Sequence, residues 1–413
     1  MRSEGFLRAM PMCAVAALVL LTATSARAAG YTVLYNFGTP SSTPSSGLIT
    51  DAAGNAYGTT SAGGSSGVGT VYELSLKTGY HLLYSFHKTS TGFRPQGNLV
   101  LDSDGNLYGT TTQGGIDNAF CSTGCGVVFE LSPPSKGDQW TETVLYSFCS
   151  QTNCADGFYP QAGVIFDSTG NLYGATEYGG TDNNGTVFEL QPTQSGWTES
   201  VLYSFIGGGV DGAYPLGSLV FDSSGNLYGT LSSFGPGVGS AFSLSPAAGG
   251  WTFTLLYAFA EFSNQDGYSP YAGMVFDAAG NLYGTTSGGG QFGFGTAFEL
   301  SPGFETWTET ILYNFAGGND GAQPEANLVF DRSGNLYGTT FAGGNTKGRC
   351  GTVFRLTPSR NGQWGESLFR FPLDGSLGLE PTSPVTLDTQ GRVYGTTTSG
   401  GKANSGVLFR ITQ

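Results

Sequence analysis

Gly225-Asn226-Leu227-Tyr228-Gly229-Thr230 is the stretch that decides the fold, because the chain repeats it. Its first five residues recur from Gly105, Gly170, Gly280 and Gly334, and altered copies begin at Gly54 and Gly391. The steps between the first glycines are 51, 65, 55, 55, 54 and 57 residues. A period of this size is typical of a repeat architecture in which each repeat is one supersecondary unit. The 413 residues therefore contain seven copies of one unit.

One full unit, residues 218–259, predicts four short antiparallel strands. The strands are expected at residues 219–222, 226–230, 240–244 and 251–259. Gly225 supplies the positive φ of the tight turn between the first two. Four such strands in one step of the repeat are the size of a propeller blade. The strands are apolar on both faces, as expected for a blade packed between two neighbours.

The two ends of the chain predict how the ring closes. Residues 31–37 match a fourth strand without a blade before it, and residues 406–411 match a third strand without a fourth after it. Joining them gives an all-β, seven-bladed β-propeller over residues 29–413, closed by a blade of three strands plus one. Closure would also hide the sheet edges that a linear array leaves open.

Residues 1–28 read as a secretory signal peptide. Arg2 and Arg8 precede the apolar stretch Cys13–Leu21, and Ala26-Arg27-Ala28 has the form of a cleavage site. We therefore expect a secreted, extracellular or cell-surface protein, with the periplasm as an alternative. A short uncleaved membrane anchor is the other interpretation of this segment.

The chain is acidic, which limits its partners. It has 16 Lys and Arg against 30 Asp and Glu, and cleavage after residue 28 leaves 13 against 29, a net charge of −16. Because phosphate binding depends on clustered Lys and Arg, we expect no nucleic-acid partner. We also expect a monomer that does not insert into a membrane after cleavage. One interpretation of the acidity is that it keeps the protein soluble. The other is that cations, glycans or proteins are the partners.

Five cysteines follow the predicted cleavage site. Cys121 and Cys125 are four residues apart, and Cys149 and Cys154 are five apart, all within the one step of 65 residues. In an oxidising compartment we expect two disulfides, with local pairing as the hypothesis among three connectivities. Cys350 has no evident mate. A zinc site is not expected, since no tetrahedral ligand set at the usual spacing is present.

The repeat also resembles a known family. In order, the unit reads DGxxP, LVFDxxGNLYGTT, GTVFELSP and WTETVLYSF, and this is similar to the tandem repeat called GloVer of bacterial exported proteins, which carry one of several C-terminal surface anchors. The resemblance covers essentially the whole mature chain and implies a secreted or surface-displayed protein without an assigned biochemical role. The chain ends at Gln413 directly after a strand, so we expect secretion without such an anchor. The unit also resembles the blade of NHL-type propellers.

An Asp-Gly pair recurs in the loop that follows each of five fourth strands. The five aspartates are the candidate ligand-binding residues: Asp156, Asp211, Asp266, Asp320 and Asp374. Ringed near the channel mouth, they could hold calcium or a polar ligand. Alternatively, each Asp caps its own turn, and recurrence from blade to blade favours capping.

We expect a non-catalytic binding or structural module that takes a glycan or protein on its loop face. Acid–base catalysis by histidine is not expected, because His81 and His87 are the only histidines in the sequence and no Gly-x-Ser-x-Gly motif is present. The alternative is a polysaccharide hydrolase or lyase that uses Asp or Glu near the channel mouth. Apart from calcium, no cofactor is expected. The clearest asymmetry between units lies in residues 113–126 and 149–157.

Overall fold

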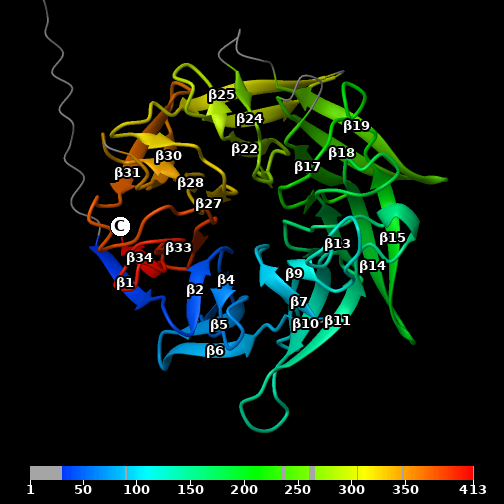
Figure 1. Cartoon of the computed structure of the whole chain (residues 1–413). Helices are drawn as coiled ribbons and strands as arrows, with labels where there is room; N and C mark the ends of the chain where they lie inside the picture. The colour runs from blue at the N-terminus through cyan, green and yellow to red at the C-terminus, as the bar shows by residue number, and fades with distance from the viewer. Residues whose placement is uncertain are drawn as a thin grey trace, which may run out of the picture.

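The computed structural model describes residues 30–88, 91–233, 238–259, 266–304, 306–346 and 348–412. The predicted signal peptide, residues 1–28, lies outside the described residues. The described chain forms seven four-stranded antiparallel blades around a central channel, as Figure 1 shows. Apart from one turn of 3-10 helix in this part of the chain, η1 (Thr152–Cys154), the regular structure is all β. The predicted all-β, seven-bladed propeller is confirmed.

The first three blades run from the channel outward in chain order. Blade 1 is β3 (Ile49–Thr50), β4 (Ala56–Gly63), β5 (Thr70–Ser75) and β6 (Gly79–Ser85). Blade 2 is β8 (Val100–Leu101), β9 (Leu107–Gly114), β10 (Val127–Ser132) and β11 (Thr141–Ser147). Blade 3 is β12 (Ile165–Phe166), β13 (Leu172–Thr176), β14 (Thr186–Thr193) and β15 (Gly196–Ser204).

The next three blades repeat this order. Blade 4 is β16 (Val220–Phe221), β17 (Leu227–Leu231), β18 (Ser240–Ala247) and β19 (Gly250–Ala258). Blade 5 is β21 (Val275–Phe276), β22 (Leu282–Thr286), β24 (Thr296–Pro302) and β25 (Trp307–Asn314). Blade 6 is β27 (Val329–Phe330), β28 (Leu336–Thr340), β30 (Thr352–Pro358) and β31 (Trp364–Arg370).

Short strands extend four of these blades at the channel side. In blades 1 and 2 they are β2 (Ser41–Pro44), paired with β4, and β7 (Gly92–Pro95), paired with β9. In blades 5 and 6 they are the pairs β20 (Gly267–Tyr268) with β23 (Gly288–Gly289) and β26 (Gly321–Ala322) with β29 (Ala342–Gly343). The innermost strand of each blade has two residues, shorter than the sequence predicted.

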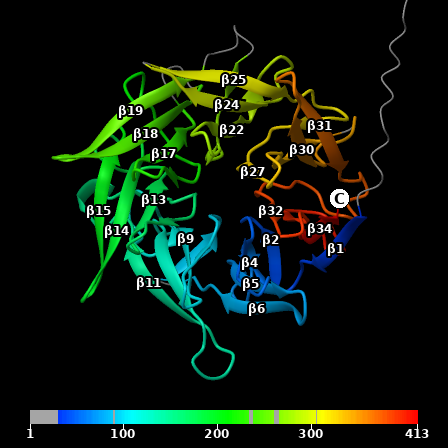
Figure 2. The same cartoon turned by 180° about the vertical axis from the view of Figure 1, so that it is seen from behind.

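Blade 7 closes the ring with both ends of the described chain. It consists of β32 (Thr386–Leu387), β33 (Val393–Thr397), β34 (Val407–Thr412) and β1 (Gly30–Asn36). β1 pairs antiparallel with β34 from Gly30 opposite Thr412 to Asn36 opposite Val407. The views from the two sides, Figures 1 and 2, both show β1 beside β34. The predicted blade of three strands plus one is confirmed.

The repeated turn is built around an aspartate. The Asp222 carboxylate accepts hydrogen bonds from the backbone N–H of Asn226 and Ser224, from the Asn226 side chain and from the Tyr228 hydroxyl. Gly225 has a φ of 83° at the end of this turn. The repeated phrase therefore encodes a hairpin cap, with Asp, Gly, Asn and Tyr each holding the turn between the first two strands.

The core consists of the interfaces between blades. At every junction, the last aromatic residue of a fourth strand packs edge-to-face on an aromatic ring from the third strand of the next blade, as Phe205 does on Phe242 at 5.3 Å between ring centroids. The glycine of the repeated phrase makes room for that ring, because a Cβ on Gly229 would lie 2.7 Å from Phe242. Both faces of each blade are therefore apolar, which explains why the strands do not alternate.

The disulfides pair locally, as hypothesised. Cys121 is bonded to Cys125 and Cys149 to Cys154, while Cys350 is buried and not disulfide-bonded. Within the described ranges, no helix is long and apolar enough to cross a membrane.

Candidate binding face at the channel mouth

The loops from each fourth strand to the next first strand share one end of the ring with the loops from second to third strands, because antiparallel strands alternate direction. We call this end the loop face. On it, each blade places one non-glycine residue with positive φ, between 55° and 61°, directly before a proline. This pre-proline ring consists of Thr43, Arg94, Tyr159, Tyr214, Ser269, Gln323 and Glu380.

Hydrogen bonds between blades hold the pre-proline ring in this uncommon conformation. The Arg94 N–H donates to the Val68 carbonyl in the preceding blade, and the Tyr214 N–H donates in the same way to Asn184. Left-handed backbone costs energy in a residue other than glycine and persists only where the surroundings enforce it. The seven side chains therefore project from a rigid frame, and they comprise six residue types, with tyrosine at two positions.

A second set of variable side chains lines the channel two positions further along the chain. This channel ring consists of Ser45, Gln96, Gln161, Leu216, Tyr271, Glu325 and Thr382. The space that they enclose measures about 110 Å³. Tyr271 is 39% exposed, and burial raises the pKa of the Glu325 carboxyl. The channel wall is thus mostly polar, and apart from the glutamine shared by two blades its residue type changes around the ring, unlike the repeated hairpins behind it.

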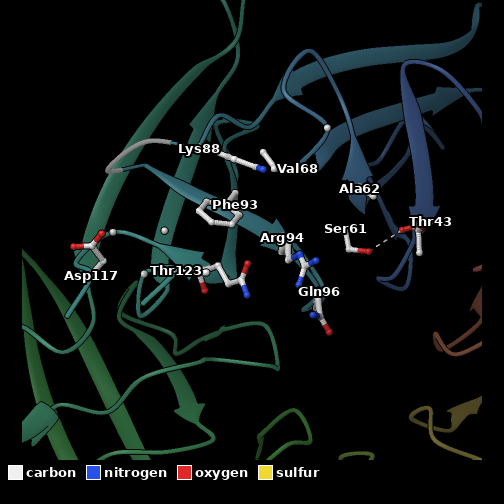
Figure 3. A pocket seen from close by; sticks show the side chains of 15 residues that line it. Thr43, Ser61, Ala62, Val68, Lys88, Phe93, Arg94, Gln96, Asp117 and Thr123 are labelled. Carbon is white, nitrogen blue, oxygen red and sulfur yellow. Dashed lines mark hydrogen bonds between the residues drawn. The ribbon is translucent and has the colours of Figure 1, made fainter. Parts of the chain in front are cut away.

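A cavity of about 970 Å³ lies between blades 1 and 2 on the loop face. Its lining comes from β2, β4, β7 and β9 and from the loops around them; its side chains include Lys88, Phe93, Arg94, Gln96, Gln113 and Thr123 (Figure 3). Gln96 belongs both to this lining and to the channel ring. The cavity and the channel mouth therefore adjoin. We call this cavity the blade 1–2 pocket.

The blade 1–2 pocket is also bordered by the disulfide loop that the sequence marked as asymmetric. Gln113, Asp117 and Thr123 all come from residues 113–126. The Cys121–Cys125 disulfide closes this loop beside the pocket. The asymmetric loop that the sequence marked therefore borders this pocket, although the sequence did not single out Arg94 or Lys88.

Most of the predicted ligand-binding aspartates lie inside the blade junctions. Asp156, Asp211 and Asp266 are 0%, 1% and 7% exposed. The Asp211 carboxylate accepts hydrogen bonds from the backbone N–H groups of Ile206 and Gly207 and from the Tyr203 hydroxyl. This is the capping alternative that the sequence left open. A direct contact with a ligand stays a prediction for these residues, and the burial of Asp156 and Asp211 leaves them almost no surface for it.

The two remaining candidates are more accessible. Asp320 is partly buried and accepts a hydrogen bond from the Tyr313 hydroxyl at 3.1 Å. Asp374 is exposed and accepts hydrogen bonds from the backbone and hydroxyl of Ser376, which hold its pKa below the usual value. The five aspartates are bonded within five different loops, and none of them lines the channel or the blade 1–2 pocket. None of the residues that line the channel or the blade 1–2 pocket was among the ligand-binding residues predicted from the sequence.

Three of these aspartates face a glutamate of the next blade. The pairs are Asp156 with Glu199, Asp266 with Glu309 and Asp320 with Glu366. Burial, followed by the charge of the neighbouring aspartate, raises the pKa of Glu199 to about 7 and those of Glu309 and Glu366 to about 8. The raised pKa values favour the protonated form of each glutamate, which reduces the repulsion between the two carboxyl groups.

The recurring tryptophans pack within the blade junctions. Trp197, Trp251 and Trp307 each lie beside the tyrosine of the repeated phrase in the preceding blade, at 6.1 to 6.4 Å between ring centroids. They begin or follow the start of a fourth strand, at the end of the blade opposite the loop face. They do not contribute to the loop-face cavities.

Within the described ranges, the only cluster of three potential metal-ligating side chains is Cys121, Cys125 and Cys149, and all three are disulfide-bonded. The site that the structure offers is therefore a channel mouth and an adjoining pocket, both lined by side chains that vary between blades. A rigid ring that presents variable side chains at one end defines the class of the protein, a closed seven-bladed β-propeller built from a tandem repeat.

The chain belongs to the family described as the Gloeobacter/Verrucomicrobia repeat, whose sequence profile matches residues 20–238 and 222–413. The resemblance noted from the sequence is thereby confirmed. No curated protein matches the chain.

Two solved structures are similar in fold. One is assigned as an oxidoreductase (glucose dehydrogenase) from Thermus thermophilus, with 14% identity, a TM-score of 0.45 and coverage of 92% of this chain and 99% of the other. The second is assigned as a 6-phosphogluconolactonase from Bacteroides uniformis, with 15% identity, a TM-score of 0.49 and coverage of 80% and 85%.

Proposed function

We propose that this protein is a secreted, non-catalytic binding module that takes a glycan or protein ligand on its loop face. The observation that carries the proposal is the position of the variable residues. The hairpin turns and junction aromatics recur around the ring, whereas most positions of the channel ring and of the pre-proline ring change from blade to blade. Because scaffolds place function on the loops that they hold rigid, the variable loop face is where a ligand would bind.

Secretion is part of the same proposal. Residues 1–28 have the signal-peptide pattern, and the two disulfides fit an oxidising compartment. N-terminal sequencing of protein recovered from the culture medium of the native host tests it. A mature N-terminus at or near Ala29 supports the proposal, and a full-length chain in the cytoplasm contradicts it.

A glycan array, with a parallel screen of proteins from the same extracellular medium, tests the binding role. The screen uses the wild type, Gln96→Ala and Tyr271→Ala, with Arg360→Ala as a control in the loop between β30 and β31 at the opposite end of the blade. We expect the two loop-face variants to lose at least tenfold in affinity and the control to bind normally. A ligand that binds all four proteins equally would contradict the proposal. Running the array with and without EDTA shows whether calcium takes part.

A polysaccharide hydrolase or lyase is the second candidate, and Glu325 favours it. This carboxyl lines the channel, and burial raises its pKa toward the range in which a carboxyl can act as a general acid. Incubation of the wild type and Glu325→Gln with polysaccharides, followed by an assay of new reducing ends or unsaturated products, tests it. Activity that is present in the wild type and lost in Glu325→Gln would establish the second candidate instead of the first.

A further inference from the structure

We infer that the blade 1–2 pocket is a subsite for the carboxylate group of an acidic saccharide, with Arg94 as the main recognition residue. The inference rests on the proposed binding function and names the chemistry of its ligand. The geometry behind it is a cavity of about 970 Å³ that opens beside the channel mouth and carries two cationic side chains, Arg94 and Lys88.

The cationic lining is unusual for this chain. The sequence has almost twice as many acidic as basic residues, yet Asp117 is the only acidic side chain among those that line this pocket. Arg94 and Lys88 are both exposed, and neither makes an ion pair within the described ranges, where the single ion pair joins Arg392 to Asp388. Two unneutralised cations in one cavity of an acidic protein favour an anionic ligand.

Arg94 is held where it can meet a ligand. It has a φ of 57°, its N–H donates to Val68 at 2.8 Å, and its carbonyl accepts from the Thr112 hydroxyl at 3.2 Å. In Figure 3 the Arg94 side chain lies beside Gln96, and Lys88 extends over the opposite edge of the pocket, toward Val68. A guanidinium group on a fixed backbone binds a carboxylate with two parallel hydrogen bonds, which makes arginine selective for this group.

The corresponding position in two neighbouring blades is occupied by an aromatic residue. Tyr159 and Tyr214 take the place of Arg94 in the pre-proline ring and pack near Tyr178, at 6.3 and 5.3 Å between ring centroids. These rings pack together on the loop face of blades 3 and 4. Between blades 1 and 2, by contrast, Arg94 lines an open cavity and gives it a positive charge.

The remaining lining favours a saccharide over an acidic peptide. Gln96, Gln113 and Thr123 each offer both a donor and an acceptor, which matches sugar hydroxyl groups. The side-chain carboxylates of an acidic peptide only accept hydrogen bonds, so its donors are confined to the backbone N–H groups. The partly buried ring of Phe93 adds an apolar surface at the centre of the pocket (Figure 3).

Calorimetry with trigalacturonic acid and its fully methyl-esterified form tests the inference, because the ester removes the charge and keeps the sugar. The variants are Arg94→Gln and Lys88→Gln, with Lys136→Gln as a control in the loop between β10 and β11. Arg94→Gln is compatible with the backbone, since Gln323 occupies the same position with a φ of 56°. Melting temperatures of all variants verify that the fold is retained.

We expect the acid to bind the wild type and the Lys136→Gln control with equal affinity. Its affinity for Arg94→Gln should be at least tenfold lower than for the wild type, and its affinity for Lys88→Gln several-fold lower. The methyl ester should bind at least tenfold more weakly than the acid. Equal binding of acid and ester, normal binding by Arg94→Gln, no binding of the acid by the wild type, or tighter binding of hexaglutamate would each overturn the inference. A neutral glycan that needs Tyr271 but not Arg94 would overturn it while leaving the proposed function intact.

Discussion

Tyr72 is the one residue at which a blade departs from the aromatic pattern of its third strand. The other six blades have phenylalanine there: Phe129, Phe188, Phe242, Phe298, Phe354 and Phe409. Tyr72 is completely buried, and its hydroxyl has no hydrogen-bond partner among the described residues. A buried hydroxyl without a partner costs about 1–3 kcal/mol.

Tyr72→Phe should therefore raise the free energy of unfolding by about 1 kcal/mol. Tyr228→Phe is the matched control, because its hydroxyl donates to Asp222 at 3.1 Å and its loss should lower stability. Urea denaturation of both variants measures the difference. A destabilised Tyr72→Phe would contradict this account of the hydroxyl.

The turn aspartates also contribute to the free energy of unfolding. Burial alone would raise the pKa of Asp222, but hydrogen bonds from the side chain and backbone of Asn226 outweigh it and lower the pKa. Asp222→Ala removes the acceptor for these bonds and for the Tyr228 hydroxyl. We expect a loss of about 1–3 kcal/mol in the free energy of unfolding. Ser223→Ala, in the same turn, should cost little, and equal losses in both variants would contradict the capping role.

The element on which ring closure depends is β1. Its ring contacts include Tyr31 stacked on Phe369 at 4.4 Å and Tyr35 stacked on Tyr80 at 3.9 Å between centroids. Phe37 follows directly and packs on Tyr72 of blade 1 at 5.2 Å. One short segment thus contacts blade 6, completes blade 7 and contacts blade 1.

Deleting residues 31–37 should open the ring, lower the melting temperature and promote aggregation through the exposed edge of β34. Phe37→Ala alone should cost about 3–5 kcal/mol, because Phe37 is fully buried. Leu76→Ala, at an exposed position between β5 and β6, is the control. A truncated protein with an unchanged melting temperature and no aggregation would refute closure by β1.

At the scale of the whole molecule, the carboxyl pairs at three junctions predict an unusual dependence on pH. The pKa values of Glu199, Glu309 and Glu366, about 7, 8 and 8, lie above the ordinary value of 4.5. Between pH 4.5 and 8, the folded protein therefore binds more protons than the unfolded chain. Its free energy of unfolding falls as pH rises through this window.

Urea denaturation at pH 5 and pH 8 measures this effect. We expect lower stability at pH 8, and a smaller difference in Glu309→Gln and Glu366→Gln, since glutamine imitates the protonated side chain. Asp104→Asn, at an exposed turn, should leave the difference unchanged. Higher stability at pH 8 than at pH 5 in the wild type would contradict the raised pKa values.

The ring could be predicted from the sequence because the same local hairpin contacts are encoded in each of the seven repeats. Gly225, Asn226 and Tyr228 each make contacts within one hairpin, so their spacing revealed both the turn and the number of blades. The local disulfides could be predicted for the same reason. The innermost strand of blade 4 is Val220–Phe221 and not residues 219–222, because Asp222 at its predicted end caps the hairpin turn.

The candidate site could not be predicted in the same way. Arg94 and Thr123 are separated in sequence and meet only through the packing of β7 and β9 with the disulfide loop. The aspartates of the Asp-Gly pairs accept hydrogen bonds within their own loops, and their binding of a ligand stays a prediction. The sequence did contain a signal for the variable positions of the loop face. The residues on either side of each loop proline vary between repeats, whereas the proline itself is present in every repeat.

Hydrogen–deuterium exchange on a saccharide complex tests whether binding occurs where the blades differ on the loop face. We expect a bound ligand to protect the backbone of residues 91–98 and 113–125, beside the blade 1–2 pocket, and to leave residues 133–140 at the opposite end of blade 2 unchanged. Protection confined to residues 133–140 and the equivalent loops of other blades would show that the ligand binds elsewhere.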